Sequence, residues 1–240
     1  MNPPLATIIL SFLVPTMGLV LIFAGLARLV GLHPKGWGWC AGLTLVSLAI
    51  VMVPLRGMPL ARWLAAVVDH WSVPLTALLA STCIQRLFGI DLLQRNERRT
   101  ACISGAVAGL LLYPLALGWG PFDPYGLGWH FGPLFVSVGV LAAILIWRKN
   151  SFGVVLVLAI AAWHLRAVES GNYWDCLIDP FYFLFSAGAL AAWAWRACAG
   201  GSKSPGASLQ GLKDAAMKTH ANDQRSGSCL PSPPGLRWPG

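Results

Sequence analysis

The stretches LVSLAIVMV (residues 45–53) and VVLVLAIAAW (residues 154–163) decide the fold class, because neither contains a charged residue. A membrane-spanning β-strand would alternate polar and apolar residues over about ten positions, and neither stretch shows that alternation. Similar apolar runs recur along the chain and approach the roughly 20 residues that a helix needs to cross a hydrocarbon core. The sequence therefore predicts an all-α, polytopic bundle of transmembrane helices and excludes a β-barrel.

The composition agrees with this fold class. The 240 residues are 56% hydrophobic and only 11% charged, with a mean hydropathy of +0.64, which is far more apolar than a soluble domain of this length. The first apolar run has no Lys or Arg before Arg28, whereas a signal peptide carries positive charge ahead of its apolar region. This run is therefore expected to be a retained first helix.

About seven spans are expected. They cover residues 5–26, 37–53, 63–88, 101–117, 131–147, 152–166 and 176–196. Pro74 lies inside the long third segment and should kink or interrupt it, because proline removes a backbone donor. Six spans plus one interfacial helix is the competing arrangement.

The distribution of Lys and Arg predicts the orientation, since positive residues near short loops stay on the cytoplasmic side. Ten such residues map to one side, namely Arg28, Lys35, Arg86, Arg95, Arg98, Arg99, Arg148, Lys149, Arg196 and Lys203. The other side holds three, Arg56, Arg62 and Arg166. The N-terminus is therefore expected outside and the C-terminus in the cytoplasm of a bacterial inner (plasma) membrane.

The chain divides into a helical domain over residues 1–198 and a tail over residues 199–240. The tail is rich in Gly, Ser and Pro, is net positive, and has no apolar period, so it is expected to be disordered. No CxxC pair, nucleotide-binding loop, nucleophile elbow or HExxH pattern occurs, and nothing suggests nucleic-acid binding. An enzymatic function therefore has no support from a motif, and no cofactor is indicated by one.

Acidic and histidine residues concentrate on the predicted outer side. They are Asp69, His70, Asp123, His130, His164, Glu169, Asp175 and Asp179. The main candidates for an outward-facing polar cavity are Asp69, His70, His164, Glu169, Asp175 and Asp179, with Asp123 and His130 as secondary candidates. This one-sided cluster is the most informative feature of the sequence.

Two of these groups have competing interpretations. Asp69 and His70 lie about two helical turns inside the membrane if the third span begins near Trp63, and ionisable residues at that depth are functional candidates. If the helix begins only after Pro74, both residues lie in a loop instead. His70 and His164 approach the same face and are the pair that an axial haem or a metal ion would need, although a lone histidine is more often a packing residue.

Asp-Pro pairs occur at Asp123-Pro124 and Asp179-Pro180. Aspartate is a good N-cap and proline fits the first helical position, so both pairs are typical of helix starts. The functional alternative is that Asp175 and Asp179 face a cavity with Glu169, where grouped carboxylates bind a cation or relay protons.

Three GxxxG patterns, at Gly38/Gly42, Gly105/Gly109 and Gly128/Gly132, allow close helix approach within the chain or in a homo-oligomer.

These sequence features lead to three hypotheses about function. The first is a membrane protein that binds or moves a proton, cation or small solute through the polar cavity. The second is a structural or assembly factor that docks a membrane-protein partner, and the third is a haem- or metal-binding protein or enzyme that uses His70 and His164. The first is favoured because it alone uses the whole polar cluster.

Overall fold

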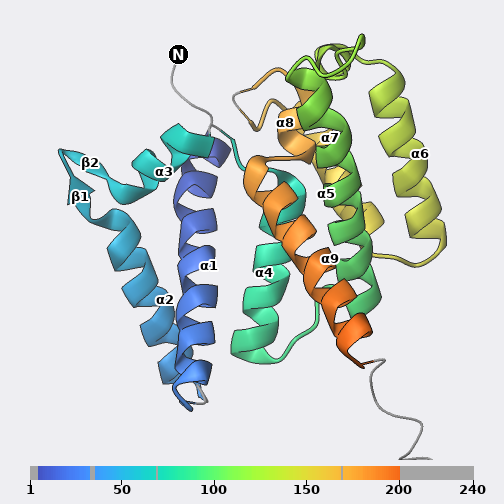
Figure 1. Cartoon of the computed structure of the whole chain (residues 1–240). Helices are drawn as coiled ribbons and strands as arrows, with labels where there is room; N and C mark the ends of the chain where they lie inside the picture. Colours follow the sequence, from blue (N-terminus) through green and yellow to red (C-terminus); the bar gives the residue numbers. More distant parts are fainter. Residues whose placement is uncertain (1–4, 33–35, 69, 169, 201–240) are drawn as a thin grey trace, which may run out of the picture. The chain divides into compact units, whose positions relative to one another are not determined.

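The computed structural model describes residues 5–32, 36–68, 70–168 and 170–200 (Figure 1). Within these residues the chain is all-α, with nine α-helices, one short 3-10 helix and a hairpin of two two-residue strands. The chain divides into two units, Met1–Ala191 and Ala192–Gly240. The first unit contains α1 to α8 and the first part of α9. Residues 201–240 of the predicted tail lie outside the described residues, as do Asp69 and Glu169.

The elements have the following bounds: α1 Leu5–Leu29, α2 Trp37–Met52, β1 Pro54–Leu55, β2 Met58–Pro59, α3 Leu60–Val68, α4 Val73–Phe88, α5 Arg95–Ala116, η1 Tyr125–Gly128, α6 Pro133–Trp147, α7 Phe152–His164, α8 Tyr173–Leu177 and α9 Pro180–Gly200. The helices expected at 5–26, 37–53, 131–147 and 152–166 agree with α1, α2, α6 and α7 to within a few residues.

Two of the described helices, α1 and α5, are long and apolar enough to cross a membrane. Four others, α2, α4, α6 and α7, are apolar but shorter, with 10 to 17 residues each. Large apolar side chains are exposed on all six, such as Ile22 on α1, Leu110 on α5 and Val140 on α6. Exposed apolar surface on this scale is typical of a protein that associates with a membrane or another apolar partner.

The segment expected as one span over residues 63–88 is interrupted before Pro74, because the chain forms two separate helices there, α3 and α4. The expected interruption is confirmed, and a single span over these residues is wrong. Ser72 caps α4 by accepting a hydrogen bond from the Leu75 N–H at 3.3 Å. Pro74 fits the first turn of α4, where a backbone donor has no partner within the helix. His70 consequently lies in a loop, and α3 is too short to span a membrane.

The helix expected to begin at residue 101 begins earlier, since α5 starts at Arg95. Gln94 and Glu97 form a capping box in which the Gln94 N–H donates to Glu97 Oε2 at 2.6 Å. The other Glu97 oxygen accepts the Ser151 N–H at 2.6 Å. The buried carboxylate thus ties the start of α5 to the turn between α6 and α7.

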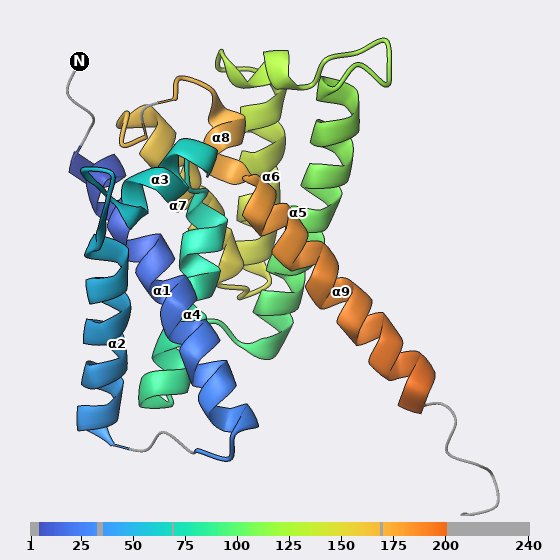
Figure 2. The ribbon, with the colours of Figure 1, turned by 60° about the vertical axis from the view of Figure 1, so that its left-hand side comes forward.

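Within the first unit, the helices pack mainly around α1 and α7. α1 packs against α2, α3 and α4, and α7 packs against α4, α5 and α6. Figures 1 and 2 show that α3, α8 and the loop carrying η1 lie at the same end of these helices. This end is the one that the sequence predicts to face outward.

α9 packs closely against α5 through two glycines. A Cβ on Gly105 would lie 2.5 Å from Ser186 Oγ and 2.7 Å from Tyr182 Cζ, and a Cβ on Gly109 would overlap the Phe183 ring. The Gly105/Gly109 pattern is therefore an intramolecular contact. Gly38 and Gly42 on α2 differ, since a Cβ on either would have nothing within 4 Å.

Alanine substitutions at Gly105 and Gly42 should therefore affect stability differently. Gly105→Ala should destabilise the protein by about 1–3 kcal/mol, because the added methyl group overpacks the contact with α9. Gly42→Ala adds the same atom to an open helix face and should leave stability unchanged or raise it by up to about 1 kcal/mol. Thermal unfolding of both variants in the same detergent compares them directly, and equal effects would contradict this account of α5 and α9.

Candidate functional site

The loop carrying η1 is held against the start of α8 by two hydrogen bonds to its backbone carbonyls. Asn172 accepts the Trp174 N–H at 3.0 Å as the N-cap of α8, and its amide donates to the Tyr125 carbonyl at 3.0 Å. The Trp174 indole N–H donates to the Pro124 carbonyl at 2.8 Å. Gly128 packs directly on Asn172, where a Cβ would overlap the amide. These contacts place Tyr125 beside Asp175, the acidic residue of α8.

Asp175 accepts hydrogen bonds from two hydroxyl groups. The Tyr125 hydroxyl donates to Asp175 Oδ2 at 3.2 Å, and the Ser170 hydroxyl donates to the same oxygen. The side chain is half-buried. No described residue forms an ion pair with this carboxylate; the ion pair found among the described residues joins Arg98 and Asp91. The negative charge of Asp175 is therefore hydrogen-bonded but not neutralised by a described cation.

Asp179 has a different environment. It is 3% exposed and precedes Pro180, the first residue of α9. Its Oδ1 accepts the Tyr182 N–H at 2.8 Å, and its Oδ2 accepts the Ser72 N–H at 2.8 Å. Asp179 thus caps α9 and joins it to the start of α4.

Both carboxylates line one pocket of about 340 Å³ in the first unit. Its polar lining is His70, Tyr113, Tyr125, Asp175 and Asp179. Its apolar lining is Val68, Leu112, Ala116, Ile178 and Pro180. The chain thus brings the loop before α4, the end of α5, η1 and the α8–α9 junction together around a single pocket.

The structure places the predicted site residues in three groups. His70, Asp175 and Asp179 line the same pocket. His164, at the end of α7, is exposed and does not line it, and the exposed Asp123 and His130 do not line it either. Asp69 and Glu169 lie outside the described residues.

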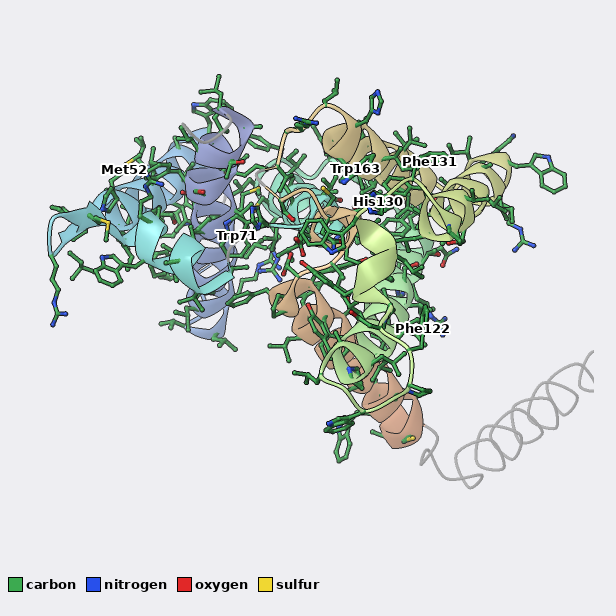
Figure 3. All side chains as sticks on the ribbon, turned by 90° about the horizontal axis from the view of Figure 1, so that it is seen from above. Met52, Trp71, Phe122, His130, Phe131 and Trp163 are labelled. Carbon is green, nitrogen blue, oxygen red and sulfur yellow. The ribbon has the colours of Figure 1, made fainter. Side chains whose placement is uncertain are left out.

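The aromatic residues near His130 and His164 form a separate cluster. Phe135 stacks on Tyr173 with ring centroids 4.1 Å apart and packs against Trp163 at 4.4 Å. Phe131 also stacks on Phe135, with ring centroids 5.3 Å apart, and Figure 3 labels Phe131 and Trp163 in a view from above. This cluster is apolar packing between α6, α7 and α8.

The paired-histidine hypothesis gains no support from this geometry. His70 lies in the pocket, while His164 is exposed at the end of α7. Among the described residues, no group of three or more His, Cys, Asp and Glu side chains is placed to hold a metal ion. The five cysteines in this part of the chain are free thiols.

Several site residues were not predicted from the sequence. Tyr113 and Tyr125 line the pocket, and Ser170 and Ser72 hold its two carboxylates. The only sequence signal for them was indirect, since Tyr125 follows Asp123-Pro124 and Ser72 precedes Pro74 at a helix start. Their contacts with Asp175 and Asp179 span up to 107 residues and depend on tertiary folding.

Comparison of the chain with protein-family models, with curated proteins and with solved structures gave no match. The pocket itself is therefore the basis on which a function is proposed.

The two backbone hydrogen bonds accepted by Asp179 predict that its substitutions lower stability by different amounts. Asp179→Ala leaves the Ser72 and Tyr182 N–H groups without their acceptors and should cost about 3 kcal/mol. Asp179→Asn can still cap α9 but cannot accept both bonds, so it should cost about 1 kcal/mol. Thermal unfolding in detergent measures this order, with the exposed Asp123→Ala as the control. Equal unfolding temperatures for Asp179→Ala and the control would contradict the assigned role.

Proposed function

We propose that the chain is a multi-pass protein of a bacterial inner membrane that binds a cation or a small cationic solute in an outward-facing pocket. The observation that carries the proposal is the convergence of His70, Asp175 and Asp179 on one pocket of about 340 Å³. Ionisable groups gathered in a membrane protein's interior mark solute or ion sites by default.

The membrane part of the proposal is supported by the helices. α1 and α5 are long and apolar enough to span a membrane, and four shorter helices are also apolar. The residues expected in the cytoplasm include Arg28, Arg86 and Arg148, whereas the pocket lies at the end with few Lys or Arg residues. The positive-inside rule then places the pocket on the outer side.

Asp175 is the carboxylate assigned to the solute. Asp179 is 3% exposed and accepts two backbone N–H bonds that cap helices of the fold. Asp175 accepts only hydroxyl bonds, from Tyr125 and Ser170, so its charge is held in position and still lacks a described counter-ion. A cation entering the pocket would supply that counter-ion.

The competing hypotheses have less structural support. An assembly factor would use the open face of α2 around Gly38 and Gly42, and nothing in the structure indicates what covers that face. A haem or metal protein would need His70 and His164 to converge, and only His70 lines the pocket.

The proposal predicts that cations stabilise the protein through Asp175. A ligand at one hundred times its dissociation constant stabilises the folded state by about 2.7 kcal/mol. Thermal unfolding with K⁺, Mg²⁺ and alkylammonium salts should show such a rise for at least one cation. Asp175→Asn should abolish the rise, because it removes the charge and keeps an oxygen that accepts hydrogen bonds. Asp123→Asn, an exposed carboxylate outside the pocket, should retain it, and a rise equal in all three proteins would contradict the proposal.

A further inference from the structure

We infer that the preferred ligand of this pocket is a compact alkylammonium ion rather than a bare metal ion, an inference that rests on the proposed function. One side of the pocket presents the carboxylate of Asp175, and another side is lined by apolar side chains. A ligand that matches both sides must carry a positive charge and an apolar group.

The charged side is Asp175. Its hydrogen bonds from Tyr125 and Ser170 keep the carboxylate in one position. An ammonium group can donate to the remaining oxygen lone pairs and balance the charge. An anionic ligand would be repelled by Asp175 and Asp179, which line the same pocket.

The apolar side is built from α5 and the start of α9. Leu112 and Ala116 lie on α5, and Ile178 and Pro180 flank Asp179. A hydrated metal ion would leave this surface in contact with water, whereas an alkyl group would cover it and remove it from water, which is favourable. The side chains of these four residues cannot coordinate a metal.

The number of oxygen donors also disfavours a bare metal ion. Ca²⁺ takes six to eight oxygen ligands, and Mg²⁺ requires near-octahedral geometry. Asp179 is 3% exposed and bonded to two backbone N–H groups, so the half-buried Asp175 is the pocket carboxylate that a ligand can reach. One carboxylate suffices for an ammonium group, which needs only two or three acceptors.

Two tyrosine rings complete the match. Tyr113 and Tyr125 both line the pocket, and an aromatic ring attracts a cation placed over its face within about 6 Å. Alkylammonium ions are bound in this way because their charge is spread over a weakly hydrated surface. The volume of about 340 Å³ has room for a cation with several carbon atoms, since a water molecule occupies roughly 30 Å³ of the liquid.

The test is calorimetric titration of the full-length protein in an uncharged maltoside detergent. The probes are butylammonium, tetramethylammonium, K⁺ and Mg²⁺, each as the chloride. At least one of the two organic cations should bind about tenfold or more tightly than either metal ion. Asp175→Asn should weaken that binding by about tenfold or more, a loss that fits removal of a partly buried charge partner.

A second pair of variants tests the aromatic and apolar side without changing a charge. Tyr113→Phe keeps the ring and should bind the organic cation within about twofold of the wild type, whereas Tyr113→Leu should bind it about fivefold more weakly. Ala116→Leu adds carbon atoms to the pocket and should weaken tetramethylammonium more than K⁺.

The outcomes separate this inference from the proposed function. Asp175-dependent binding in which K⁺ or Mg²⁺ is preferred would overturn the inference and leave the proposed cation site standing. No binding of any probe, or binding that Asp175→Asn and Ala116→Leu both leave unchanged, would overturn both. Organic-cation binding that is lost in Asp175→Asn and weakened in Tyr113→Leu supports both.

Discussion

The buried carboxylate of Asp179 satisfies backbone N–H groups at the starts of two helices, and the pocket depends on that interaction. Its two oxygens accept hydrogen bonds from Ser72, which begins α4, and from Tyr182 in the first turn of α9. Ser72 and Asp179 are 107 residues apart in the sequence. Without the carboxylate, two buried donors would lose their partners, and the loop containing His70 would no longer be held beside α8 and α9. One capping residue therefore determines which side chains can meet.

Two aspartates four residues apart consequently have different roles, and their hydrogen-bond donors explain the difference. Asp179 accepts hydrogen bonds from two backbone N–H groups at helix starts, so its role lies within the fold. Asp175 accepts hydroxyl groups from Tyr125 and Ser170, which orient it and leave its charge without a described cation. The proposed solute site follows from this difference rather than from the number of acidic residues, since the exposed Asp123 has no place in the pocket.

The sequence was sufficient for the parts of the structure that depend on local patterns. Apolar runs predicted α1, α2, α6 and α7, and the Asp179-Pro180 pair was recognised as a possible helix start. The break before α4 was left open by the sequence, because Pro74 indicated an interruption while the apolar run through it was compatible with one long span. Ser72 and Pro74 together form a helix-start signal that agrees with the break. The contacts of Tyr125 with Asp175 could not be predicted, because no local pattern relates residues 50 positions apart. His164 was grouped with His70 on sequence position alone, and the structure leaves it exposed.

The claim that the pocket opens on the outer side of a membrane is central to this account, and cysteine labelling in cells tests it directly. His130 is exposed on the loop between η1 and α6, so His130→Cys provides a reporter beside the pocket end. The exposed native Cys198 lies in the part of the chain that the sequence predicts to be cytoplasmic. The thiol reagent must be one that cannot cross the inner membrane. The account predicts that it labels the His130→Cys protein in cells whose outer membrane alone is opened. It should label the wild type only after the inner membrane is dissolved. Wild-type labelling in the intact inner membrane, with no additional labelling of His130→Cys, would contradict it.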